Sequence, residues 1–126
     1  DLAGALSNPA TVTVTLSGGE TLSFVRAEYI ANKRRWRIEG ISSVLGTQTV
    51  YVMYADGIFA DGTSAVGYLV GTAQIDPLGA WAVDFTLAGT NDPRNPTSTV
   101  FSVRPTRINA ITTLGGSAPP TPFLVR

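Results

Sequence analysis

The stretch that decides the fold is Gly71–Phe85, GTAQIDPLGAWAVDF. Asp76–Gly79 supplies turn geometry, because its proline fixes φ near the value of turn position i+1 and its glycine accepts positive φ. On the returning segment, Trp81, Val83 and Phe85 alternate with small or polar residues, which is the period-two pattern of a half-buried strand. The stretch therefore predicts a β-hairpin whose return arm supplies much of the buried face of one sheet.

Length and net charge restrict the class of protein. With 126 residues the chain fits one domain that can bury a core without disulfide support. It contains no cysteine, so neither a disulfide framework nor a thiolate metal site is expected. The formal net charge is zero, which argues against a nucleic-acid binder. No apolar run reaches the roughly 18 residues of a membrane span.

The composition favours strands and turns. Charged residues make up 14% of the chain, against roughly 25% in typical soluble domains, and small polar and apolar residues take their place. Because the sequence begins at Asp1 rather than Met, we expect a processed product or an excised fragment, and a removed secretory signal is one explanation. The expected location is extracellular or at a cell surface.

Alternating apolar residues place further strands on both sides of the predicted hairpin. Thr21–Ile30 changes its buried face after Phe24, so we expect a β-bulge or a crossing between sheets there. Thr49–Ala55 is apolar on both faces and is expected at the centre of a sheet. No helix-length window carries the helical spacing of apolar residues. The other predicted strands are Ala10–Leu16, Arg35–Ile41, a final core strand at Thr97–Arg104 and, at an edge, Arg107–Thr113.

Short strands separated by turn signals predict an all-β sandwich. Two Asp-Gly pairs, Asp56-Gly57 and Asp61-Gly62, mark an excursion at one end of it. The sandwich is assigned to residues 10–114, with an N-terminal arm at 1–9 and a C-terminal arm or linker at 115–126, where glycine, serine and proline are frequent.

The order of motifs around the hairpin resembles that of bacterial Ig-like domains, the modules strung in tandem in bacterial surface adhesins and appended to secreted enzymes. The matching segments are Trp36–Gly40, Val50–Val52, Gly71–Asp76 and Gly79–Trp81, and together they span under half of the chain. The resemblance implies an Ig-like Greek-key β-sandwich of about 7–9 strands that serves as a spacer, stalk or adhesive unit. Three segments depart from it: Asp56–Val66 looks inserted, Arg104–Arg107 does not match the closing motif, and the leading strand at Pro9–Leu16 looks extra.

Few residues point to chemistry. The chain has no histidine, so it lacks Ser-His-Asp and Cys-His nucleophile systems, and its carboxylates cannot be paired from sequence. We therefore expect that it is not an enzyme and has no cofactor. Calcium is the one metal considered, because it prefers carboxylate and carbonyl oxygens. Turn formation is the favoured explanation of the same residues, since each of them stands beside a glycine or a proline. The candidate ligands are Asp56, Asp61, Asp76 and Asp92.

Two further groups of side chains could bind a ligand. Trp36 and Trp81 could stack on sugars, but their alternation with other apolar residues favours the core. A basic patch could contact an acidic polysaccharide, a phosphate or an acidic neighbour, or could simply be a solvated hairpin end. The patch consists of Arg26, Lys33, Arg34, Arg35 and Arg37.

Protein partners are the most direct expectation. Either terminal arm could lie on a neighbouring subunit by strand addition, or could fold back on its own sandwich. We predict a non-catalytic extracellular module whose partners are copies of itself or neighbouring domains, with filament or stalk assembly or adhesion as its role. A carbohydrate-binding accessory module or a virion decoration protein are the alternatives. The candidate contact residues are Leu2, Leu6, Tyr51, Met53, Phe123, Leu124 and Val125.

Overall fold

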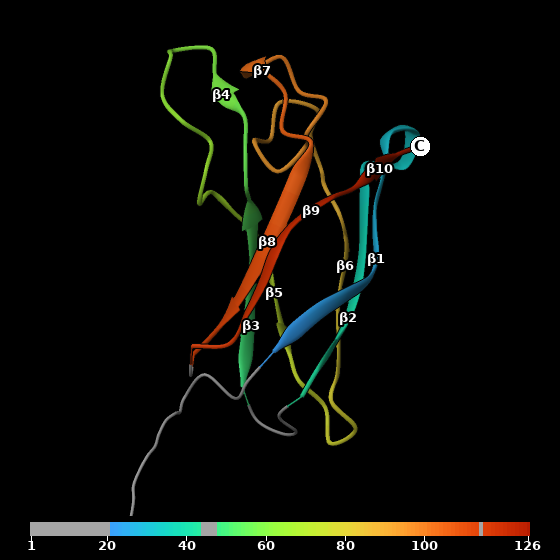
Figure 1. Ribbon diagram of the computed structural model, residues 1–126. Helices are drawn as coiled ribbons and strands as arrows, with labels where there is room; N and C mark the ends of the chain where they lie inside the picture. Colours follow the sequence, from blue (N-terminus) through green and yellow to red (C-terminus); the bar gives the residue numbers. More distant parts are fainter. Residues whose placement is uncertain (1–20, 44–47, 114) are drawn as a thin grey trace, which may run out of the picture.

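The computed structural model describes residues 21–43, 48–113 and 115–126 of the chain. In this part, two four-stranded sheets pack face to face, so the predicted all-β sandwich is confirmed (Figure 1). No α-helix occurs in the described ranges, and η2 (Ala31–Lys33) is a single 3₁₀ turn. Among the described residues, no helix has the length and apolarity that crossing a membrane requires. The predicted strand at Ala10–Leu16 and the N-terminal arm with Leu2 and Leu6 lie outside the described residues.

The first sheet has the strand order β10-β1-β2-β6. Its register shifts between Phe24 and Arg26 of β1, which confirms the predicted bulge and leaves Val25 pointing to solvent. β1 runs antiparallel to β2, and the short β10 adds to the other side of β1 in parallel. The strands are β1 (Leu22–Ile30), β2 (Arg35–Ser42), β6 (Ala80–Thr86) and β10 (Leu124–Val125).

The second sheet has the order β5-β3-β8-β9. β3 lies between β5 and β8, which confirms the predicted central position of this segment. β8 lies between β3 and β9, so the prediction of an edge strand there is wrong. Its inward residues Ile108 and Ala110 are fully buried, a pattern masked in the sequence by the short side chain of alanine. The strands are β3 (Thr49–Tyr54), β5 (Leu69–Gln74), β8 (Arg107–Thr112) and β9 (Ser117–Pro122).

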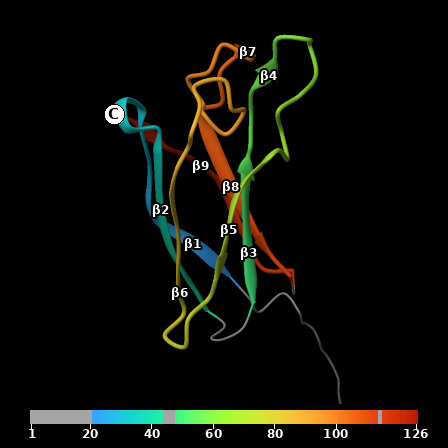
Figure 2. The ribbon, with the colours of Figure 1, turned by 180° about the vertical axis from the view of Figure 1, so that it is seen from behind.

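The segment predicted as a hairpin connects the two sheets instead. β5 belongs to one sheet and β6 to the other, and the turn at Asp76–Gly79 carries the chain across the end of the sandwich (Figure 2). The two strands face each other through the core: a Cβ at Gly71 would lie 2.7 Å from Cγ1 of Val83. The apolar residues of β5 and β6 therefore pack against each other from opposite sides of the core. The two strands of a hairpin would instead lie next to each other in one sheet.

A small two-stranded ribbon closes the opposite end of the sandwich. It pairs β4 (Ile58–Phe59) with β7 (Phe101–Val103). The excursion expected after the first Asp-Gly pair is β4, so its position at one end is confirmed. The strand predicted over Thr97–Arg104 is only partly formed and is no core strand, because the chain before β7 turns repeatedly at Asn95 and Ser98.

The core is built around aromatic side chains between the sheets. Trp36 packs on Tyr29, with ring centroids 5.1 Å apart, while Trp81 meets the edge of Phe24 at 5.6 Å. The indole of Trp81 lies over Gly40, the residue that pairs with it on β2. A glycine at this position leaves the space that the ring fills.

The C-terminal segment is part of this sandwich. The prediction of an arm or linker at 115–126 differs from the structure, where β9 continues the second sheet and β10 the first. Three prolines in β9, Pro119, Pro120 and Pro122, remove backbone donors from that edge, and such an edge resists pairing with another chain. The segment therefore closes one side of the sandwich, in line with the alternative in which the arm folds back on its own domain.

Candidate functional site

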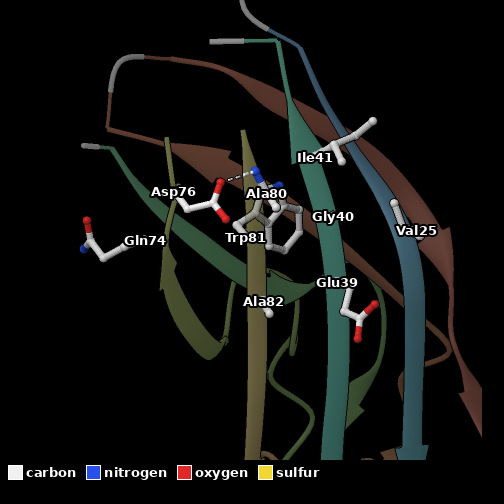
Figure 3. A pocket seen from close by; sticks show the side chains of 9 residues that line it. All are labelled: Val25, Glu39, Gly40, Ile41, Gln74, Asp76, Ala80, Trp81 and Ala82. Carbon is white, nitrogen blue, oxygen red and sulfur yellow. Dashed lines mark hydrogen bonds between the residues drawn. The ribbon is translucent and has the colours of Figure 1, made fainter. Parts of the chain in front are cut away.

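Each aspartate considered as a calcium ligand accepts hydrogen bonds from other groups of the protein. Asp76 accepts the N–H groups of Leu78 and Ala80, both at 2.9 Å, through Oδ1 (Figure 3). Asp61 accepts the N–H and hydroxyl of Thr63. Asp92 forms an ion pair and hydrogen bonds with the following Arg94 instead. No group of three or more Asp, Glu, His or Cys that could hold a metal ion exists within the described ranges.

Asp56, the fourth aspartate, joins the end of β3 to the start of β8. Its carboxylate accepts the N–H of Thr106 at 2.7 Å and the hydroxyl of the same residue at 2.5 Å, and it also accepts the N–H of Arg107. Partial burial acts to raise the pKa of Asp56, but these hydrogen bonds outweigh it and the pKa lies below its usual value. The residue therefore has a structural role in its ionised form.

Asp56 is expected to make the stability of the protein fall in acid. Because its folded pKa is lowered below the ordinary value of 3.8, its contribution is complete above pH 3.8 and disappears as the pH falls through the folded value. We expect Asp56→Asn to lower the free energy of unfolding by roughly 1–2 kcal/mol at pH 7. In urea titrations from pH 7 to pH 2, the gap between variant and wild type should narrow below about pH 4.

Asp61→Asn is the matched control for this prediction, because Asp61 hydrogen-bonds only within its own turn. It should change the free energy of unfolding by less than about 0.5 kcal/mol. An Asp56→Asn variant as stable as wild type at pH 7 would show that the carboxylate does not hold the two strands.

The basic patch is largely neutralised by its neighbours. Arg35 forms a bidentate pair with Asp84, with both N···O distances at 2.8 Å, and Arg37 lies 3.9 Å from the same carboxylate. Arg34 donates to a backbone carbonyl. Arg26 contacts Glu28 at 3.5 Å. Among the described residues, Lys33 is the member of the patch for which neither an ion pair nor a side-chain hydrogen bond is found.

The two tryptophans belong to the core, as their alternation predicts. Trp36 and Trp81 are buried, so neither indole offers a platform on which a sugar could stack. Nε1 of Trp36 donates to the carbonyl of Arg94 at 2.6 Å, and the Tyr54 hydroxyl donates to the carbonyl of Pro93 at 2.7 Å. These two bonds fix the long loop before β7 onto the sandwich. Sequence reasoning missed this role, because backbone carbonyls leave no signal in a sequence.

The three candidate contact residues at the C-terminus divide between core and surface. Phe123 is buried, and its ring centroid lies 4.9 Å from that of Trp36. Leu124 and Val125 are exposed on β10. The Arg126 side chain forms an ion pair with the buried Glu28. The backbone N–H of Arg126 donates to the carbonyl of Tyr29 in β1, and its carbonyl accepts the N–H of Ala31 in η2. The segment is thus fixed to its own domain at both ends of β10.

An apolar patch covers the outer face of the second sheet. Tyr51 and Met53 of β3 point outward and are half-buried. Met53 pairs with Leu69 of β5, and Tyr51 pairs with Ile111 of β8, so that the four side chains lie on neighbouring strands. We call Tyr51, Met53, Leu69 and Ile111 the outer patch. The sequence identified its first two members, whereas the pairing that adds the others is a tertiary feature.

An open hollow of about 420 Å³ lies on the outer face of the first sheet. Its apolar lining comes from three strands, and Trp81 lies beneath it. Glu39 and Asp76 also line it, and neither carboxylate forms an ion pair with a described residue (Figure 3). The apolar lining residues include Val25, Ile41, Ala80 and Ala82.

Comparison with known proteins identifies no relative, because no family model, curated protein or solved structure matches this chain. The fold defines the class: an all-β sandwich with two packed four-stranded sheets. Its distinguishing surfaces are the outer patch and the hollow.

Proposed function

We propose that this protein is a non-catalytic structural module of a cell surface, which acts through contacts with copies of itself or with neighbouring domains. The observation that carries the proposal is the outer patch, where four apolar side chains on three adjacent strands face solvent. Contiguous apolar patches on the surface of a soluble domain are typical of protein contact sites. Single exposed leucines are common, but neighbouring ones on one sheet face are not.

An Ig-like assignment of the sandwich is part of this proposal. Seven strands form its body, with β1, β2 and β6 in one sheet and β5, β3, β8 and β9 in the other. The chain crosses between the sheets after β2 and again after β5, as Greek-key sandwiches of the immunoglobulin type do. Such sandwiches serve many functions, so the fold by itself supports a structural role only together with the surfaces. The low charge content and the resemblance to bacterial surface modules support the extracellular location.

The outer patch can be tested with two exposed leucines. Leu69 lies in the patch and is 46% exposed, while Leu124 lies on β10 of the other sheet and is 61% exposed. We expect Leu69→Lys to weaken self-association at least about tenfold, because a charge replaces an apolar contact. The matched change Leu124→Lys should leave self-association unchanged. Sedimentation velocity over a range of concentrations measures both.

Equal effects of the two changes would remove the outer patch from the proposal. Thermal melts of the variants confirm that each remains folded, and a surface change away from the core should move the free energy of unfolding by less than about 0.5 kcal/mol.

A further inference from the structure

We propose that the β4–β7 end of one copy seats in the hollow of a second copy, so that copies join head to tail. This inference rests on the proposed function, and it adds a second contact between copies that is separate from the outer patch. The inserted surface, which we call the tip, consists of Ile58, Val103 and Arg104. The receiving surface is the hollow, with Glu39 and Asp76 beside its apolar lining.

Charges that form no ion pair are unevenly distributed between the two ends of the molecule. Among the acidic side chains of the described ranges, three form no ion pair: Glu39, Asp76 and Asp61. The first two line the hollow, toward the end where Asp76–Gly79 turns. Asp61 lies at the opposite end, in the loop after β4, and like Asp76 it accepts hydrogen bonds from its own turn through Oδ1.

The unpaired cations lie at the other end. Lys33, Arg34 and Arg104 form no ion pair with a described residue. Lys33 and Arg34 lie where β1 turns into β2, and Arg104 follows β7 directly (Figure 1). Arg34 already donates to the carbonyl of Leu87, so it is held by its own loop. Arg104 is exposed, and its guanidinium is free to meet carboxylates outside the chain.

Apolar surface accompanies the charge on both sides. On the tip, Ile58 and Val103 pair with each other across β4 and β7 and are 40% and 53% exposed. In the hollow, Val25 and Ile41 are exposed beside small alanine side chains, which leave room for a partner. The tip, with two apolar side chains and one arginine, is therefore complementary to the hollow, which has an apolar lining and two carboxylates.

The position of the two surfaces determines the kind of assembly. The tip lies at the end of the sandwich where β3 leads into β4, and the turn from β5 to β6 lies at the opposite end (Figures 1 and 2). Asp76 and Ala80, on either side of that turn, line the hollow, which therefore lies near that opposite end. A contact between different surfaces of identical copies is heterologous, and it extends into a row unless the rotation closes a ring. The contact is small, so weak association is expected, with much of its affinity sensitive to salt.

A charge exchange tests this contact. We expect Arg104→Glu alone and Glu39→Arg alone each to weaken self-association about tenfold, because each places like charges together. The double variant Arg104→Glu/Glu39→Arg should restore association to within about threefold of wild type, since the pair is re-formed with reversed signs. Lys33→Glu is the control: it removes another unpaired cation at the same end of the molecule without touching the tip. Sedimentation velocity at about 50 mM salt and up to about 1 mM protein measures all four.

A milder variant guards against misfolding at Glu39, which pairs in register with Arg26 on β1. Glu39→Gln keeps the size of the side chain, and we expect it to weaken association about threefold. If wild type associates but the double variant shows no rescue, or Lys33→Glu weakens association as strongly as Arg104→Glu, the tip and the hollow do not meet. In that case assembly through another surface still stands. If wild type remains monomeric throughout, both this contact and self-assembly are contradicted.

Discussion

Replacing Phe123 by alanine is expected to lower the free energy of unfolding by about 3–4 kcal/mol, the range found when a buried phenylalanine ring is lost. The residue is only 8% exposed, and its ring packs edge-on against Trp36. It also anchors the crossing from β9 to β10, where its N–H donates to the carbonyl of Thr106. The change therefore opens a cavity between the sheets and loosens the strand that borders β1. Urea-induced unfolding followed by tryptophan fluorescence measures the loss.

The adjacent Leu124 provides the control for Phe123. It is 61% exposed on β10, and Leu124→Ala should change the free energy of unfolding by no more than about 0.5 kcal/mol. The pair also distinguishes two placements of the C-terminal segment. If the segment lay on a neighbouring copy, the loss in Phe123→Ala would depend on protein concentration. A loss that is independent of concentration agrees with a segment bound to its own domain, and equal stability of the two variants would contradict the placement of Phe123 in the core.

Replacing Gly40 by alanine is expected to lower the free energy of unfolding by about 3 kcal/mol, at the upper end of ordinary overpacking effects. A Cβ at this position would lie 2.6 Å from the carbonyl oxygen of Ser23 and closer still to the indole of Trp81. The backbone of β1 cannot retreat without breaking its pairing with β2, and the indole is confined by Phe24. The added methyl group must therefore displace the indole of Trp81 or separate β1 from β2.

Gly89→Ala is the matched control for Gly40. No atom lies within 4 Å of the Cβ that this substitution would add. It should leave the stability unchanged or raise it by up to about 1 kcal/mol, because alanine restricts the unfolded chain more than glycine does. Thermal melts followed by circular dichroism compare the melting temperatures of the two variants. A Gly40→Ala protein with the melting temperature of wild type would contradict the packing of Trp81 over β2.

The strands of this protein could be predicted wherever alternation is regular. β2 begins at Arg35 and β3 at Thr49, as their patterns predict, and the change of face in β1 corresponds to a bulge. The neighbouring strands in a sheet are harder to predict, because alternation indicates which face of a strand is buried but not which sheet the strand joins. Gly71–Phe85 illustrates this limit: its pattern fits a hairpin and a crossing between sheets equally well.

Two further differences have the same kind of cause. β8 contains one large inward residue, Ile108, beside a small one, Ala110, so its central position depends on the neighbours that cover it. Ser117–Pro122 has the composition of a linker, yet it pairs with β8 as the last strand of its sheet, a position where proline is tolerated. Local composition could not indicate either outcome.

The surfaces could be predicted only in part. Alternation places Tyr51 and Met53 on one face of a strand that is apolar on both faces, and the basic patch is visible from its charges. The sequence could not show that Asp84 neutralises two of those arginines, since it lies about fifty residues away on β6. Nor could it show that Glu39 and Asp76, on different elements, border one hollow. Both depend on strand pairing.

The mass and shape of the 126-residue chain in solution test the central claim most directly. Light scattering after size-exclusion chromatography, with negative-stain microscopy of the same fractions, should cover concentrations up to about 1 mM, where even weak contacts are populated. We expect a mass that rises above the 13.2 kDa of one chain as the concentration increases, with elongated rows of particles at the highest concentrations. A mass of 13.2 kDa throughout, with single particles only, would contradict assembly from copies of this chain.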